Sequence, residues 1–259
     1  MSRRQWIREE RILAMNLYCR LPFGKLHSSN PEIIALAHAI DRTPSSVAMK
    51  LCNLASLDTA HQERGVKGLS GASKGDRAIW NEFHDDWDRL AVESESLREQ
   101  FQLDTDDDSD EEMSDLPLQE YRGEIDATAT VKVRRAQRFF RRSVLASYDS
   151  KCCITGIGVS QLLIASHILP WAKYPEHRTD PRNGFCLSRL HDAAFDRGLI
   201  TFDEDFRLVL SAVLNDATSN QTMAASFKAF EGQSIELPSR FRPSEKYVKQ
   251  HRESIFVDR

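Results

Sequence analysis

Long apolar runs are missing from this sequence of 259 residues. No stretch approaches eighteen uninterrupted apolar residues, so we expect no transmembrane helix and no membrane partner. The first residues, MSRRQWIREERIL, lack the apolar centre of a signal peptide. These two absences predict a cytoplasmic protein.

Cysteine is also scarce, with five residues in the whole chain. An odd number of scattered cysteines does not indicate a disulfide framework. Cys152, Cys153 and Cys186 form no C-x-x-C pairs, so a structural zinc of that kind is not expected and we interpret them as small buried residues. A glycine-rich stretch at 61–75 carries Lys67 and Lys74 but lacks the spacing of a phosphate-binding P-loop, which favours a surface loop.

Charge is abundant but segregated. Charged residues make up 29% of the chain and the formal net charge is only -4. Residues 104–115 are almost all acidic, whereas 132–142 hold six Lys or Arg and no acid. The asymmetry indicates a local anion-binding face beside an acidic segment. We interpret 101–120 as a disordered acidic linker, with mimicry of nucleic acid by this segment as the alternative.

The first hundred residues predict a helical region. Amphipathic helices are expected at 3–20, at 31–40 after the cap Ser29-Asn30 with Pro31, and at 45–56 after Asp41-Arg42-Thr43-Pro44. Two short helices joined by a tight polar break resemble a helix-turn-helix, in which the second helix would contact a DNA groove through Ser45, Ser46, Lys50 and Asn53. A plain helical hairpin that packs or dimerises is the alternative. The turn has Asp41 where such turns often use glycine.

A basic amphipathic helix is expected from Val131 to Tyr148. Its apolar positions recur at helical spacing, and five arginines occupy much of the remainder: Arg134, Arg135, Arg138, Arg141 and Arg142. Guanidinium groups pair bidentately with phosphate oxygens, so we predict that these arginines bind nucleic acid. A solvated helix face is the alternative, although it would more often mix charges of both signs.

Three residues of the stretch 151–210 attract attention. His167 ends an apolar run expected to be a strand, Asn183 lies in a polar turn, and His191 follows Ser188 near the start of a short helix. Strands are also expected near Cys152 and at 185–187, and a hairpin at 199–210. A buried imidazole needs a polar partner or a chemical task. The sequence around His251 shows no polar partner for its ring, so we expect this side chain at the surface.

The segments ASHILPW, DPRNGFCLS and LHDAAFDRG resemble the HNH endonuclease family, in the branch written C-x-x-T-G, S-H-I, N-G, H-x-x-F-D-x-G. The resemblance covers about 128–215 and implies a ββα-metal site, in which two strands and a helix hold one divalent cation. We therefore expect an α+β protein: a helical, helix-turn-helix-like region at 1–100, the linker at 101–120, and an HNH nuclease domain with a helical extension at 121–259.

The resemblance also implies site roles. His167 is expected to be the general base, Asn183 to lock the inter-strand loop and orient His167, and His191 to hold the metal. Many relatives place an acidic residue or His before the base as a metal ligand, whereas this chain has Ser166. Asp196 is therefore a second expected ligand, with a hydrogen bond to the loop as its alternative role.

These features predict a metal-dependent endonuclease that hydrolyses DNA, with Mg²⁺ as the first choice of ion and Mn²⁺, Ni²⁺ or Zn²⁺ as alternatives. Bacterial restriction or phage defence is the expected setting, and a homodimer is possible. The rival hypothesis is a DNA-binding regulator that keeps a catalytically silent HNH fold. The intact set of His167, Asn183 and His191 favours the nuclease.

Overall fold

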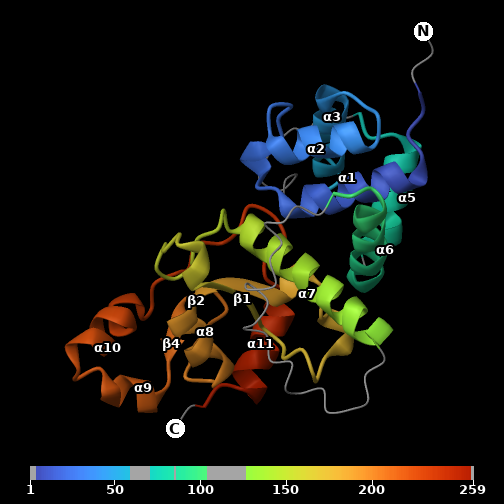
Figure 1. The fold of residues 1–259 in the computed structure, drawn as a ribbon. Coiled ribbons are helices and arrows are strands. Elements are labelled where there is room, and N and C mark those ends of the chain that lie inside the picture. The colour runs from blue at the N-terminus through green and yellow to red at the C-terminus, as the bar shows by residue number, and fades with distance from the viewer. Residues whose placement is uncertain (1–3, 59–70, 85, 104–126, 258–259) are drawn as a thin grey trace. The chain divides into compact units, whose positions relative to one another are not determined.

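The computed structural model describes residues 4–58, 71–84, 86–103 and 127–257 and shows an α+β protein (Figure 1). Its residues group into two compact units, Met1–Ser147 and Tyr148–Arg259, which we describe separately. The predicted acidic linker lies outside the described residues from position 104 onward, as does the glycine-rich stretch up to residue 70. None of the described helices combines the length and apolarity needed to cross a bilayer.

The first unit is helical. Its elements are α1 (Arg8–Arg20), η1 (Phe23–Lys25), α2 (Pro31–Ala39), α3 (Pro44–Ala55), α5 (Lys74–Phe83), α6 (Trp87–Gln100) and α7 (Ala127–Ser147). Helix α1 packs against each of the other α-helices of this unit, and α6 also contacts α7. Helix α7, which the sequence prediction assigned to the nuclease domain, thus packs with the N-terminal helices.

Local sequence signals account for the start of α2 and α3. The Asn30 side chain accepts hydrogen bonds from the backbone of Glu32 and Ile33, and the Thr43 side chain accepts one from Ser46. Between the helices, Asp41 has a φ of 53°, the left-handed conformation that glycine usually supplies. The chain therefore makes the tight turn without glycine.

Two of the four predicted groove-contacting residues of α3 are buried. Lys50 is 6% exposed and Asn53 is 9% exposed, whereas Ser45 is exposed and Ser46 is half-buried. Burial removes Lys50 and Asn53 from a DNA contact and leaves the two serines in place. The choice between a helix-turn-helix and a plain helical hairpin stays a prediction.

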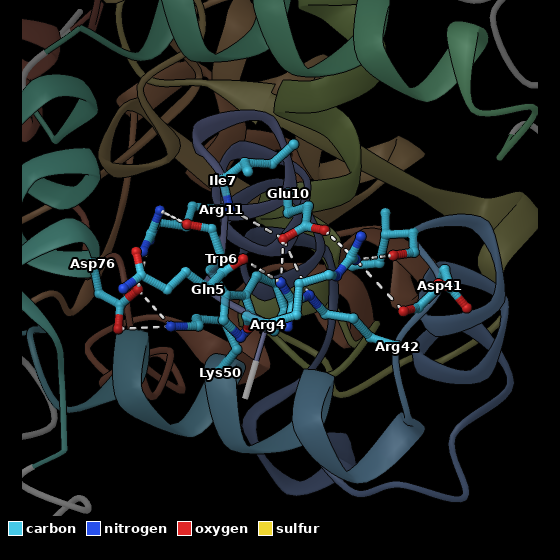
Figure 2. A network of polar contacts seen from close by, with 11 residues as sticks. Arg4, Gln5, Trp6, Ile7, Glu10, Arg11, Asp41, Arg42, Lys50 and Asp76 are labelled. Atoms are coloured by element: carbon cyan, nitrogen blue, oxygen red, sulfur yellow. Dashed lines mark hydrogen bonds and ion pairs between the residues drawn. The ribbon is translucent and has the colours of Figure 1, made fainter. Parts of the chain in front are cut away.

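Lys50 is buried because it belongs to a charge network on α1, α3 and α5 (Figure 2). Its Nζ lies 2.6 Å from Oδ1 of Asp76, a fully buried carboxylate that Arg11 also approaches at 3.3 Å. Burial raises the pKa of Asp76, but hydrogen bonds from Lys50 and Ser73 and the charge of Lys50 outweigh burial and hold the pKa below its usual value. The network stabilises the helices because a buried carboxylate without a partner is costly.

A second carboxylate completes the network. Glu10 is 3% exposed and accepts hydrogen bonds from Arg4 at 2.6 Å, Arg42 at 2.7 Å and the backbone N–H of Ile7 at 3.1 Å. Arg42 also donates to the carbonyl of Gln5. The segment before α1 is therefore fastened to the turn between α2 and α3 (Figure 2).

The second unit is mixed. Its strands are β1 (Leu163–His167), β2 (Gly184–Ser188), β3 (Ile200–Phe202) and β4 (Leu208–Leu210). Its helices are α8 (Arg189–Asp196), α9 (Ala212–Ala217), α10 (Gln221–Ser226) and α11 (Glu245–Ser254), with the 3-10 turns η5 (Ser160–Leu162), η6 (Pro175–His177), η7 (Pro181–Asn183) and η8 (Lys228–Phe230). Antiparallel pairs β1–β2 and β3–β4 form two separate sheets, and α8 contacts β1, β2 and β3.

Two expectations for this unit were wrong. Residues 152–156 form a turn rather than a strand, with Gly156 at a φ of 72° and its N–H bonded to the carbonyl of Cys152. His251 is 1% exposed rather than on the surface. Its ring stacks on Phe195 with centroids 3.8 Å apart, and Nδ1 lies 3.0 Å from the hydroxyl of Thr201. The His251 side chain thus joins α11 to α8 and β3.

Gly198 allows the chain after α8 to pass close to the end of α11. Its φ is 66°, and a Cβ placed there would lie 2.1 Å from the carbonyl oxygen of Ile255. We expect Gly198→Ala to destabilise the second unit by roughly 2 kcal/mol more than a purely conformational penalty, because overpacking against backbone cannot be relieved by a side-chain rotation. Urea unfolding, followed by circular dichroism, measures the difference.

Gly232→Ala is the matched control. Gly232 has a φ of 72°, but no atom lies within 4 Å of the position its Cβ would take. This substitution suffers only the left-handed strain, about 1 kcal/mol. Equal unfolding free energies for the two variants would show that the approach of Ile255 to Gly198 does not constrain the fold.

Candidate functional site

A short hairpin and one helix position the candidate site. In the register of β1 and β2, His167 pairs with Gly184 and Leu163 pairs with Ser188. The Ser188 hydroxyl caps α8 by accepting a hydrogen bond from the backbone N–H of His191. The strand β2 therefore runs directly into α8, which packs on the hairpin. This is the strand, loop, strand and helix order expected from the sequence.

His167 ends β1 and faces the loop between the strands. Its Nε2 lies 2.9 Å from the carbonyl oxygen of Arg178. A carbonyl only accepts, so Nε2 carries the proton of the neutral ring and Nδ1 is the basic nitrogen. Burial is the main cause that lowers the pKa of His167 to about 4; the hydrogen bond with the Arg178 carbonyl opposes this shift, and the Arg178 cation adds to it. The imidazole is therefore neutral at pH 7, the state that a general base requires.

Asn183 is fully buried and fastens the same loop. Its Oδ1 accepts a hydrogen bond from Leu169 N–H at 2.8 Å, and its Nδ2 donates to the carbonyls of Leu169 at 3.2 Å and His177 at 3.0 Å. Its backbone carbonyl accepts from Ile168 N–H. Both ends of the loop are thus held by one side chain. Because His177 precedes Arg178, these bonds also fix the carbonyl that His167 contacts.

Arg178 and Trp171 lie beside His167 on this loop, and the sequence prediction missed both. The Trp171 ring meets the His167 ring edge-on, with centroids 5.4 Å apart. The guanidinium of Arg178 lies 5.2 Å from the centroid of Trp171, and its Nε donates to the Trp171 carbonyl. A partly exposed cation thus stands one side chain away from the candidate base. The only sequence signal for this placement is that Arg178 lies in the polar stretch before Asn183.

Helix α11 braces the loop from outside. The Tyr247 hydroxyl lies 3.3 Å from Oδ2 of Asp180 and 3.2 Å from Nδ1 of His177, and its ring packs on the His177 ring. Burial and the Asp180 carboxylate raise the pKa of Tyr247 to about 12, so the phenol stays protonated and able to donate. Gln250 donates to Tyr174 at 2.8 Å. The helix therefore supports the segment on which His167 depends.

His191 is placed differently from the metal-ligand prediction. It is 3% exposed, its Nδ1 lies 2.8 Å from the hydroxyl of Ser188, and its Nε2 lies 2.9 Å from the carbonyl of Ser226. Burial lowers its pKa. Both ring nitrogens are thus engaged by the protein, and the ring packs on Phe227. In this arrangement, neither nitrogen is directed at an ion.

Two carboxylates lie on α8: Asp192, which is near Ser166 of β1, and Asp196, which is exposed. Asp192 and Asp196 are four residues apart, so their side chains lie on one side of the helix. Burial raises the pKa of Asp192, and the nearby Ser166 hydroxyl opposes this shift. Burial and the charge of Asp192 raise the pKa of Asp196 to about 6, although part of its side chain reaches solvent. The pair is therefore a local concentration of negative charge beside β1.

These oxygens fit a divalent cation. Ser166 is 2% exposed, and its hydroxyl lies near the Asp192 carboxylate. Two neighbouring carboxylates and a hydroxyl offer hard oxygen donors of the kind that Mg²⁺ and Mn²⁺ prefer. Among the described residues, no group of three or more His, Cys, Asp and Glu side chains is arranged around one point. Further ligands would have to come from water or substrate.

The five arginines of α7 do not form one open face. Arg134 is exposed, whereas Arg135 donates to Glu99 of α6, with Nε at 2.9 Å from Oε1. Arg142 lies near Arg20 of α1, and its charge helps burial lower the pKa of Arg20 to about 9. Arg138 and Arg141 are partly exposed. The prediction that this helix contacts phosphate therefore depends mainly on Arg134 and Arg138.

Comparison with protein families finds one match for this site. Residues 152–203 match the family model described as HNH endonuclease. This segment is therefore similar to HNH endonucleases. The match includes β1, the loop with Asn183, β2, α8 and β3, so it covers the whole candidate site and confirms the resemblance. A search of curated proteins found no significant match.

Within the HNH domain, the spacing of the last motif identifies a residue that the sequence analysis passed over. In H-x-x-F-D-x-G, the first residue precedes the phenylalanine by three positions. Three positions before Phe195 stands Asp192, whereas His191 precedes it by four. The chain therefore departs from the quoted motif, because Asp192 stands at the position of its histidine. The sequence alone contains this departure, since Asp192 lies three positions before Phe195.

The bonds of Asn183 predict a positioning effect. We expect Asn183→Ala to lower the rate of DNA cleavage by about 10- to 100-fold, the usual cost of losing a residue that orients an active group. The loop would keep its sequence but lose three hydrogen bonds to the side chain. The rate is measured by plasmid nicking at saturating DNA.

Asn215→Ala in α9 serves as the control, since its side chain bonds only with Lys228 and Glu231 among the described residues. Circular dichroism establishes whether both variants keep their fold. Full nicking activity in a folded Asn183→Ala protein would contradict the positioning role.

Proposed function

We propose that this protein is a metal-dependent endonuclease that hydrolyses phosphodiester bonds of DNA. The observation that supports it best is the pairing of His167 with the Arg178 carbonyl inside a loop fastened by Asn183. A structural histidine needs a hydrogen-bond partner, but it does not need its ring and that partner to be fixed from two sides. Such double fixation suits a base that must meet a water molecule in one orientation.

His167 removes the proton from the attacking water through Nδ1. The ring is neutral at pH 7, so every molecule of the free protein has the base in its active form. A pKa near 4 makes a weak base, and the negative charge of a bound phosphate raises it toward neutrality. Trp171 covers one edge of the ring and limits the directions from which water approaches.

Arg178 balances charge on the scissile phosphate, and a divalent ion held near α8 would add to this effect. Arg178 is held beside His167 through its bond to the Trp171 carbonyl, so its cation is available where the phosphate would lie. HNH nucleases generally use a divalent ion, which neutralises the phosphate and assists the leaving oxygen. The sequence prediction assigned that ion to His191 and Asp196 on α8. Bacterial restriction or phage defence, and a homodimer, remain proposals that follow from the family resemblance.

The decisive experiment compares wild type with His167→Ala on plasmid DNA with Mg²⁺ or Mn²⁺ and with EDTA. We expect nicking that EDTA abolishes and that the variant loses by about 10²- to 10⁴-fold, the range for removal of a general base. His38→Ala, an exposed histidine of α2, is the matched control and should nick at the wild-type rate. Equal nicking by wild type and His167→Ala would sink the proposal, as would no nicking by either on any DNA.

A DNA-binding regulator with a silent HNH fold is the second candidate. The bonds that occupy both nitrogens of His191 favour it, because they leave the predicted metal ligand engaged elsewhere. The same assay, combined with a gel-shift measurement, separates the two candidates. A regulator would retain DNA without cleaving it under any metal condition.

Backbone contact by α7 has its own test. We expect Arg134→Ala to weaken DNA binding several-fold and to reduce the slope of log K against log salt concentration by about 1, as for the loss of one phosphate contact. Fluorescence anisotropy at several salt concentrations measures both quantities.

Arg135→Ala is the comparison, since Glu99 already neutralises that guanidinium. Its effect on the salt slope should be smaller. A salt slope unchanged by Arg134→Ala would remove α7 from the DNA interface.

A further inference from the structure

Three arginines come together where the helices of the first unit pack. Arg20 is the last residue of α1, Arg98 lies on α6 and Arg142 lies on α7, and these three helices contact one another pairwise. Burial is the main cause that lowers the pKa of Arg20 to about 9, and the charges of Arg142 and Arg98 add to the shift. Charges act in this way only over short distances, so the three guanidinium groups are neighbours. Arg20 is still a cation at pH 7.

Arg20 has more hydrogen-bond donors than the described residues satisfy. Its side chain is 8% exposed, and its Nη2 donates to Oε2 of Glu32 at 3.3 Å. Its Nε and Nη1 are both buried and have no hydrogen-bond partner within the described part of the chain. Buried cations in proteins are normally paired and hydrogen-bonded, because the loss of water otherwise destabilises them. The two nitrogens therefore call for an acceptor that these residues do not supply.

The carboxylates beside the cluster are engaged elsewhere or face solvent. Oε1 of Glu95 accepts a hydrogen bond from Asn16 at 2.9 Å, and its Oε2 lies 3.7 Å from Nε of Arg98. The Glu32 side chain is 47% exposed, so water screens much of its charge. In their effect on the pKa of Arg20, the two neighbouring cations each outweigh both carboxylates. The cluster thus has an excess of positive charge among the residues that the structure describes.

We propose that Arg20, Arg98 and Arg142 bind a small phosphate-type oxyanion within the first unit. The Nε and Nη1 hydrogens leave different edges of the guanidinium plane, which suits a tetrahedral anion whose oxygens point in several directions. Arg20 is too deeply buried to meet the continuous backbone of a duplex, whereas the half-buried Arg142 leaves one side of the cluster open to solvent. The occupant is therefore a free phosphate ion or a terminal phosphate. The proposal does not depend on the proposed function.

The test measures binding of inorganic phosphate by the full-length protein. Phosphate is titrated calorimetrically at pH 7 and constant ionic strength, with chloride as the balancing anion. We expect one saturable site in wild type, together with a rise in unfolding temperature that chloride does not cause. A titration that shows no saturation up to about 10 mM phosphate would overturn the proposal.

Three variants locate the site. Arg20→Lys keeps the positive charge but loses the Nε and Nη1 donors, so phosphate affinity should fall about tenfold, the usual effect of losing one hydrogen bond between charged groups. Arg142→Gln removes a half-buried cation and should weaken binding several-fold. Arg77→Gln, at an exposed arginine of α5, is the control and should bind phosphate as wild type does. Wild-type affinity in a folded Arg20→Lys protein would overturn the proposal.

If Arg20→Lys does not fold, the pair of Arg142→Gln and Arg77→Gln decides the matter, since equal affinities in these two variants would overturn the proposal.

Competition experiments identify the source of the phosphate. A nucleoside monophosphate and a 5′-phosphorylated oligonucleotide are each tested against inorganic phosphate, and the one that binds most tightly is the occupant. An unphosphorylated duplex should not displace phosphate. Displacement by that duplex would assign the cluster to a DNA interface and overturn the proposal. None of these results depends on whether the protein cleaves DNA.

Discussion

The side-chain amide of Asn183 is the interaction on which the rest of the site depends. A buried amide has two donor hydrogens and one acceptor oxygen, and each left unmade would destabilise the fold by about 1–3 kcal/mol. Here Oδ1 accepts from Leu169, and Nδ2 donates to Leu169 and His177, so the amide is satisfied only when the loop follows one path. That path sets the Arg178 carbonyl, and the carbonyl sets the tautomer of His167. The hydrogen bonds of Asn183 thus stabilise the loop and also fix the tautomer of His167.

Local signals made much of the fold predictable. Asn30, Thr43 and Ser188 cap helices through bonds to residues two or three positions ahead, so a short window of sequence contains both partners. The order of β1, the loop, β2 and α8 followed from alternating apolar runs and turn residues. Asn183 was correctly placed in the loop because its neighbours Asp180, Pro181 and Gly184 are turn formers.

Contacts between residues far apart in the sequence could not be predicted. His251 was expected at the surface, but it stacks on Phe195, which lies 56 positions earlier. Lys50 was expected to face DNA, but its ammonium group forms a buried ion pair with Asp76 of another helix. Arg135 was counted as a phosphate contact, but Glu99 neutralises it. A pattern of charge along one helix shows where cations are, and only packing shows which of them are already paired.

The brace from α11 implies an order of events during synthesis. The Tyr247 hydroxyl that contacts His177 lies 70 positions further along the chain. A growing chain can form the β1–β2 hairpin and α8 well before Tyr247 has been made, so the loop bearing Arg178 would first exist without its outer support. The Asn183 bonds already set the path of the loop at that stage, because all their partners lie between Leu169 and Asn183. The outer support from α11 would therefore be added last, to a loop whose course is fixed.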